Sequence, residues 1–144
     1  MKVKMNDKQK TDNSDIRDIT YEDEYFYDTC ILIEILLNNK NFQKYKDKSV
    51  LITNLNIMEY LYYLIKNSTE ENKINSVINE LKDSVIDYDY ELMIEAAKMK
   101  YKCRNEKLSF ADCIGYLLAR KKRCKFLTCD SKFKNKKNVE FIEK

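Results

Sequence analysis

The sequence predicts one α/β domain with a mostly parallel sheet that helices cover on both faces. Two observations carry this prediction. Short, almost wholly apolar runs alternate with longer segments whose apolar residues recur at the helical period. The short runs are apolar at consecutive positions, which is typical of strands buried on both faces of a sheet. Strands that alternate with helices in this way favour β-α-β units.

The first half of the domain opens with the apolar run YFYD at 25–28, which predicts a strand. The amphipathic segment at 29–39 is expected to be a helix. SVLIT at 49–53 predicts the next strand, and a helix follows from Asn54, a suitable N-cap, to residue 67. Across 68–83, apolar residues recur at i, i+3, i+4 and i+7, which predicts a further helix.

The second half repeats the alternation. SVIDY at 84–88 predicts a short strand, and Asp89 is placed to cap a helix that runs to residue 102. A helix at 109–123 begins with Ser109 and, three residues on, Asp112, which is the spacing of a capping box. Two strands are expected to complete the domain, at 125–129 and at 138–142.

The chain divides into a short polar extension and one domain. Residues 1–20 are polar and lack periodicity, so they are expected to form a flexible extension before a domain at 21–144. No apolar stretch approaches the roughly 20 residues of a membrane span, and the first residues lack the apolar core of a signal peptide. A cytoplasmic protein without membrane contact is therefore expected.

Four carboxylates recur where expected strands end or helices begin. Asp28 and Asp130 close apolar runs, Asp112 lies in the first turn of its helix, and Glu59 lies about five residues into another. Sites of open parallel sheets lie outside the carboxyl ends of the strands, so these acids can share one edge. Glu59 reaches that edge only if its side chain faces it. Each acid also has a structural alternative: a helix cap for Asp112, a turn for Asp130, an exposed helical position for Glu59.

The absence of histidine narrows the chemistry of such a cluster. With no histidine in the chain, Ser-His and Cys-His triads and zinc sites with histidine ligands are excluded. Converging carboxylates repel one another, and Mg²⁺ or Mn²⁺ would relieve that repulsion with oxygen ligands alone. Such ions support phosphodiester cleavage. The five cysteines show no CxxC spacing and are expected to be free thiols.

Charge is distributed unevenly although the net charge is only +3. Residues 1–97 hold 12 Lys/Arg and 19 Asp/Glu, whereas residues 98–144 hold 15 Lys/Arg and 5 Asp/Glu. A basic C-terminal third points to a polyanionic partner, with a solvated basic surface as the alternative. The best candidates to contact the backbone of a nucleic acid follow Asp130 directly: Lys132, Lys134, Lys136 and Lys137.

Four segments, in order, resemble the motifs of PIN domains. YDTCILIEILL resembles their opening, an apolar strand followed by Asp-Thr or Asp-Ser and an amphipathic helix. ITNLNIMEYLYYL resembles their second segment, with Thr53 as the Ser/Thr and Glu59 as the helical Glu six residues on. LSFADCIGYLLA matches a Leu-x-x-x-Asp helix start, and FLTCDSKF matches a last strand with Thr-x-Asp. The resemblance spans residues 25–144.

This resemblance implies a PIN-like three-layer fold with about five strands and a ribonuclease dependent on Mg²⁺ or Mn²⁺. Thr29 and Thr128 would support the acids or orient water. The similarity in size to VapC-like toxins implies a homodimer that an antitoxin protein blocks. It also implies the residues that are both catalytic and metal-binding: Asp28, Glu59, Asp112 and Asp130.

The chain also departs from the family pattern. About 20 extra residues precede the first strand, Cys129 stands where Arg or Asn often precedes the last Asp, and Lys132 stands where an acid is sometimes found. A weakened or single-metal site is one reading of these departures. The sequence leaves open a toxin, an RNA-processing nuclease of rRNA or tRNA maturation, and an inactive PIN-like module that binds RNA or protein.

Overall fold

The computed structural model describes residues 24–144, so the predicted extension at residues 1–20 lies outside the described residues. Four strands in this part form a wholly parallel sheet in the order β2-β1-β3-β4. Their bounds are β1 Glu24–Tyr27, β2 Ser49–Leu51, β3 Lys125–Thr128 and β4 Val139–Phe141. Because every strand runs the same way, all the carboxyl ends lie at one edge of the sheet. The predicted α/β class is confirmed, with four strands in place of about five.

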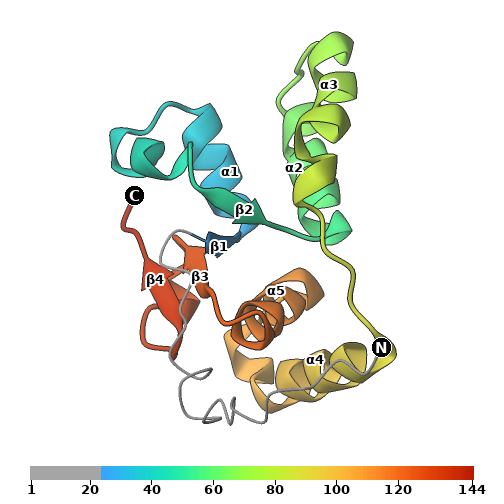
Figure 1. Cartoon of the computed structure of the whole chain (residues 1–144), viewed down its shortest axis with the longest axis vertical. Helices are drawn as coiled ribbons and strands as arrows, with labels where there is room; N and C mark the ends of the chain where they lie inside the picture. Colours follow the sequence, from blue (N-terminus) through green and yellow to red (C-terminus); the bar gives the residue numbers. More distant parts are fainter. Residues whose placement is uncertain (1–23) are drawn as a thin grey trace, which may run out of the picture.

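Helices cover both faces of this sheet (Figure 1). The α1 helix packs on one face and contacts α2, which forms a hairpin with α3, while α5 packs on the other face and is backed by α4. The bounds are α1 Thr29–Leu36, α2 Asn54–Lys66, α3 Glu71–Leu81, α4 Tyr90–Lys102 and α5 Phe110–Lys121. None of the helices within residues 24–144 is long and apolar enough to cross a membrane.

Consecutive apolar residues of the central strands feed two separate cores. Phe26 and Phe126 are fully buried in the core that α4 and α5 cover. Their neighbours Tyr27 and Leu127 are buried in the core beneath α1, α2 and α3. Side chains alternate between the two faces of a strand, so a sheet buried on both faces needs apolar residues at every position. This need explains the uninterrupted apolar runs of the sequence.

The glycine of α5 lets that helix approach the sheet closely. A Cβ atom at Gly115 would lie 2.6 Å from Cε1 of Phe26, closer than atoms can pack. Since Gly costs about 1 kcal/mol in a helix relative to Ala, its use here reflects this contact. The close approach holds α5 against β1 and β3, with its N-terminus near the carboxyl ends of the strands.

Three local details differ from the sequence predictions. Residues 84–88 form no full strand, because only Val85 pairs, in a single parallel bridge to Ile52 beside β2. The N-cap of α2 is Thr53 instead of Asn54, and its backbone N–H donates to the Asn56 side chain over 2.9 Å. A 3-10 helix at Lys40–Tyr45 was not expected. It buries two aromatic side chains in the core beneath α1.

Candidate active site

The four predicted acids line one pocket at the carboxyl edge of the sheet. Asp28 follows β1, Glu59 lies on α2, Asp112 lies in the first turn of α5, and Asp130 follows β3. The pocket has a volume of about 550 Å³ and opens to solvent between these elements. The expected convergence therefore occurs in the structure, including the facing of Glu59 on which its membership depended. The catalytic and metal-binding roles of the four acids stay predictions.

Asp28 is the most firmly held of the four acids. Its side chain is only 7% exposed and caps α1, with Oδ1 accepting from the backbone N–H of Thr29 over 2.8 Å. Its Oδ2 accepts from the hydroxyl of Thr128 over 2.6 Å and from the thiol of Cys30 over 3.6 Å. These contacts fix the carboxylate at the pocket floor, where a helix N-terminus also favours negative charge.

Burial, with a smaller contribution from neighbouring carboxylates, raises the pKa values of two acids of the pocket, Asp28 and Glu59. Burial is the main cause that raises the pKa of Asp28 to about 6, and the charge of Asp112 raises it further. Partial burial of its carboxyl group raises the pKa of Glu59 to about 7, and repulsion from the charges of Asp28 and Asp112 raises it further. Much of the Glu59 side chain remains exposed at the pocket mouth. Without a cation, this cluster therefore holds protons near neutral pH.

Asp112 and Asp130 each combine a pocket position with a local structural role. Asp112 completes the capping box of α5, because its Oδ2 accepts from the backbone N–H of Ser109 over 2.8 Å. Asp130 closes a turn, since its Oδ1 accepts from the backbone N–H of Lys132 over 3.0 Å. The helix cap expected for Asp112 and the turn expected for Asp130 as structural alternatives both occur. They engage one oxygen of each carboxylate and leave the other available to the pocket.

Two threonines connect the acids to buried polar groups. Thr128 donates to Asp28 and accepts from the backbone N–H of Asp130 over 3.0 Å, so it couples two of the acids. Thr29 is buried, and its hydroxyl accepts from the Asn56 side chain over 3.2 Å, which ties α1 to α2. A hydrogen bond from Thr29 also lowers the pKa of Glu59, against the larger effect of burial. The role of both threonines in supporting the acids or orienting water stays a prediction.

Comparison with known proteins places this chain in a family. The model of the PIN domain matches residues 25–139. The chain belongs to the PIN domain family. A search of curated protein sequences finds no match.

Two solved structures share the PIN fold of this chain. One is a chain of a toxin-antitoxin complex from Klebsiella pneumoniae, with a TM-score of 0.63 and 16% identity. That likeness covers 83% of this chain and 99% of the other. The second is a chain of VapBC2 from Rickettsia felis bound to a DNA fragment from its promoter, with a TM-score of 0.60 and 16% identity. It covers 83% of this chain and 98% of the other.

The lysines after Asp130 are not equivalent in this PIN domain. The ammonium group of Lys132 reaches the carbonyl of Lys107 over 3.3 Å, beside the start of α5. Lys134 lies over the ring of Phe141, which pairs with Thr128 at the carboxyl end of β3. Both therefore lie at the acidic edge.

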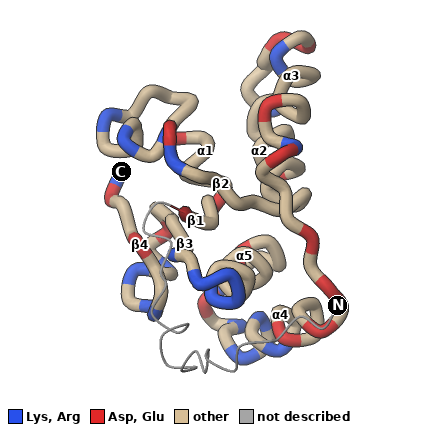
Figure 2. Tube along the Cα trace, in the orientation of Figure 1, with Lys and Arg blue, Asp and Glu red and all other residues tan. Residues whose placement is uncertain are grey.

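The other two lysines differ from the expectation that all four flank the acids. Lys136 is engaged in a 2.8 Å ion pair with Glu106. Lys137 precedes Asn138, whose side chain donates to the carbonyl of Cys124 before β3 begins, so Lys137 lies toward the opposite edge. Because β4 runs parallel to β3, the connection between the two strands must return along the sheet to the edge where both strands begin, and it carries Lys137 with it. Figure 2 shows further basic residues at the end of α5 and the start of β3.

Sequence reasoning missed several groups of the PIN pocket. Lys66 lines it, together with Tyr62 and Tyr63, which follow Glu59 by three and four residues on α2. Lys66 follows by seven, so one helical face carries the set, and that spacing was available in the sequence. Cys30 was also missed as a pocket residue. Its thiol accepts from the backbone N–H of Cys129 over 3.1 Å while it donates to Asp28.

The donor set of the pocket fits a hydrated divalent ion better than a fully protein-coordinated one. Within residues 24–144, no three Cys, Asp or Glu side chains stand close enough together to hold a metal ion directly. The pocket is instead wide, oxygen-lined and rich in mutually repelling carboxylates. Mg²⁺ keeps several of its waters when proteins bind it through one or two carboxylates. The residues present therefore suit an ion held partly through water.

Proposed function

We propose that this PIN domain is an endoribonuclease that depends on Mg²⁺ or Mn²⁺ and cleaves RNA phosphodiester bonds at the acidic pocket. One observation carries the proposal: four acids from four separate elements line a single pocket. Burial and, to a smaller extent, neighbouring carboxylates raise the pKa values of Asp28 and Glu59, so the charged forms of both acids are disfavoured without a cation. A divalent cation is the partner that would stabilise these charged forms.

The residues of the pocket have distinct proposed roles. Asp28, fixed by Thr128 and the start of α1, would be the principal ligand of the ion, and Glu59, Asp112 and Asp130 would hold it directly or through its waters. When bound, such an ion would supply positive charge that activates a water molecule and stabilises the leaving oxygen. Thr128 contacts both Asp28 and Asp130 and so fixes their positions relative to each other. Thr29 donates a hydrogen bond to the Glu59 carboxyl group at the pocket mouth.

Basic side chains beside the pocket would hold the RNA backbone. Lys132 and Lys134 lie at the acidic edge and are proposed to contact phosphates close to the cleaved bond. Lys136 and Lys137 are proposed to contact the backbone farther away. Removing the charges of the first pair should weaken RNA binding more and flatten its salt dependence more than removing those of the second pair. Equal effects of the two pairs would contradict this assignment.

A toxin of the VapC kind is the biological setting that the solved neighbours support best. Both neighbours come from toxin-antitoxin systems, so an antitoxin protein, a homodimer and a cytoplasmic location are part of the proposal. An RNA-processing nuclease with the same site is the alternative, and a partner gene for an antitoxin beside this one would decide for the toxin. Retention of all four acids argues against an inactive binding module.

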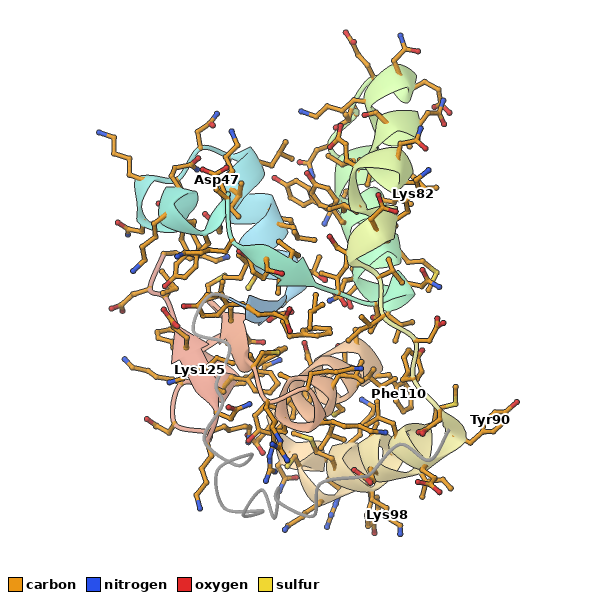
Figure 3. The ribbon with its side chains drawn as sticks, viewed as in Figure 1. Asp47, Lys82, Tyr90, Lys98, Phe110 and Lys125 are labelled. Carbon is orange, nitrogen blue, oxygen red and sulfur yellow. The ribbon has the colours of Figure 1, made fainter. Side chains whose placement is uncertain are left out.

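Cleavage of labelled RNA in the presence and absence of Mn²⁺ or Mg²⁺ tests the proposal. Wild type and Asp47→Asn should cut with added metal, because Asp47 is an exposed acid that does not line the pocket and precedes β2, at the edge of the sheet opposite the carboxyl ends (Figure 3). Asp28→Asn and Asp112→Asn should lower the rate at least 100-fold. Metal-dependent cutting that survives both substitutions would refute the proposed site.

A further inference from the structure

A second hollow lies between the end of α4 and the start of α5, apart from the acidic pocket. Its volume is about 340 Å³, within the range of about 300–1,000 Å³ that is usual for ligand sites. Two aromatic rings and three bases of its lining are called here the α4–α5 platform: Tyr101, Phe110, Lys100, Arg104 and Lys107. Among the described residues, no acid lines this hollow. It therefore favours a ligand that combines negative charge with a flat apolar surface.

Both rings of the platform are exposed and take no part in the core. Tyr101 is 71% and Phe110 57% exposed, and neither belongs to the two clusters of packed hydrophobic residues. A single exposed aromatic residue needs no explanation, but two that line the same hollow do. Covering them with a ligand would remove apolar surface from water, which stabilises the bound state.

A cation is held against each ring of the platform. The guanidinium carbon of Arg104 lies 4.7 Å from the centre of the Tyr101 ring, and the same side chain donates to the Tyr101 carbonyl over 3.1 Å. The ammonium group of Lys100 lies 5.1 Å from the centre of the Phe110 ring and donates to the carbonyl of Leu108. These contacts fix the rings and place a positive charge beside each one. A nucleobase can stack on an exposed ring while its phosphate meets the neighbouring cation.

Lys132 connects the platform with the acidic pocket at the start of α5. It follows Asp130 of the pocket by two residues, and its ammonium group reaches the carbonyl of Lys107 over 3.3 Å. On the helix itself, Phe110 of the platform precedes Asp112 of the pocket by two residues. The two sites are therefore neighbours along the surface, and basic side chains lie between them. A polyanionic strand that passes the acidic pocket can continue onto the platform.

We propose that the α4–α5 platform is a second subsite for single-stranded RNA, which holds bases away from the cleaved bond by stacking. This inference rests on the proposed nuclease function and adds the form of the substrate: an unpaired strand long enough to reach from the acidic pocket to α4. Tyr101 and Phe110 stack on bases, and the cations beside them meet the phosphates of the stacked nucleotides. Lys107 and Lys132 hold the backbone between the two sites.

The rings of the platform select for unpaired bases. In an A-form duplex the bases are stacked on one another, so aromatic side chains reach only those that are splayed out of a single strand. Every base has a flat face, so stacking adds affinity without a strong preference for sequence. The platform is therefore expected to discriminate between single strands and duplexes and not between one sequence and another.

An acidic segment of a partner protein is the competing occupant, because carboxylates would also meet the bases of the platform. Such a segment satisfies the charges but gives the two exposed rings no flat partner, whereas a nucleotide carries both a charge and a ring. The acid nearest in the chain, Glu106, does not oppose a polyanion, since it is held in a 2.8 Å ion pair with Lys136. The observations therefore favour RNA.

Fluorescence anisotropy of labelled RNA with the full chain tests the subsite, without added metal so that the RNA stays intact. Wild type should bind a single strand of about 12 nucleotides, a length that spans both sites. Tyr101→Ala and Phe110→Ala should each raise the Kd of the single strand at least about fivefold, with little effect on a duplex of the same length. Tyr101→Phe should bind like wild type, because stacking needs the ring and not the hydroxyl group.

Tyr90→Ala is the matched control. It removes a tyrosine that is 81% exposed from the other end of the same helix, next to Asp89 and Glu91, and should leave the Kd of both RNAs unchanged. Single-strand binding that both alanine variants retain, or duplex binding that falls equally, would overturn the proposal. Weaker binding of a poly-glutamate peptide by these variants, with RNA binding unchanged, would overturn it in favour of an acidic protein segment.

The binding measurement separates this subsite from the nuclease proposal, because it requires no cleavage. A wild type that never cuts RNA, but whose affinity for the single strand depends on the two rings, contradicts the nuclease proposal and supports the subsite. A wild type that cuts RNA with added metal, and whose alanine variants bind the single strand normally, overturns the subsite alone.

Discussion

Replacing Asp28 by Asn should make the stability of the metal-free protein less sensitive to pH and should weaken the stabilisation that added Mg²⁺ provides. The carboxyl group is 7% exposed, and burial raises its pKa from 3.8 to about 6. At about 1.4 kcal/mol per pH unit, this difference corresponds to about 3 kcal/mol. Because the folded-state pKa is raised, the folded state binds the proton more tightly than the unfolded chain does. The stabilising contribution of the protonated Asp28 side chain is therefore fully present below about pH 3.8 and is lost as the pH rises through about 6.

The size of the effect can be read in thermal unfolding. Integration over the two pKa values gives a loss of about 1.5 kcal/mol between pH 5 and pH 7.5 from Asp28. For a domain of this size, that loss lowers the Tm by roughly 5 °C. Asp28→Asn should remove this part of the pH dependence and, at pH 7.5 without metal, be at least as stable as wild type. The raised pKa of Glu59 acts in the same direction and leaves a residual slope.

Differential scanning calorimetry of both proteins at the two pH values, with and without Mg²⁺, provides the test. Saturating Mg²⁺ at pH 7.5 should stabilise wild type by about 3 kcal/mol at 100 times its Kd, and less at pH 5, where protons compete. Asp28→Asn should gain little at either pH. The reasoning is refuted if wild type and variant show the same pH dependence and the same response to Mg²⁺.

Three further changes test the fold and the surroundings of the pocket. Gly115→Ala should lower the free energy of unfolding by about 1–3 kcal/mol in urea, since its Cβ would overlap Phe26; a gain in stability would contradict the close approach. Thr128→Val should lower the cleavage rate at least tenfold with little change in fold, since it removes the 2.6 Å hydrogen bond to the buried acid; a rate equal to wild type would exclude that role. Lys132→Gln with Lys134→Gln should reduce the slope of log K against log salt by up to about 2, as filter binding would measure; an unchanged slope would place the RNA elsewhere.

Much of the fold could be predicted because burial leaves a direct mark on this sequence. Strands covered on both faces need apolar residues at every position, so β1 and β3 stand out, and the capping box at Ser109 fixes the start of α5. The 3-10 helix at Lys40–Tyr45 could not be predicted, since it is too short to set a period. Residues 84–88 have the composition of a strand, but only Val85 meets a partner at the sheet edge.

The candidate site shows the same division between local and tertiary information. Asp28 and Asp130 could be assigned from strand ends alone, because parallel strands bring those ends together. The position of Lys137 depends on the path of the chain between β3 and β4, which no local pattern contains. Cys30 lines the pocket and accepts a hydrogen bond from the backbone N–H of Cys129, which lies 99 positions away in the sequence. Such contacts become visible only in the folded chain.

The most direct test of the central claim is a count of Mn²⁺ ions bound at equilibrium, measured by electron paramagnetic resonance of free Mn²⁺. The account predicts one or two bound ions per chain in wild type and in Asp47→Asn, with the affinity rising from pH 5 to pH 7.5 as the acids lose their protons. Asp28→Asn and Asp112→Asn should bind at least tenfold more weakly. Equal binding by all four proteins would contradict the claim that these acids form a metal site.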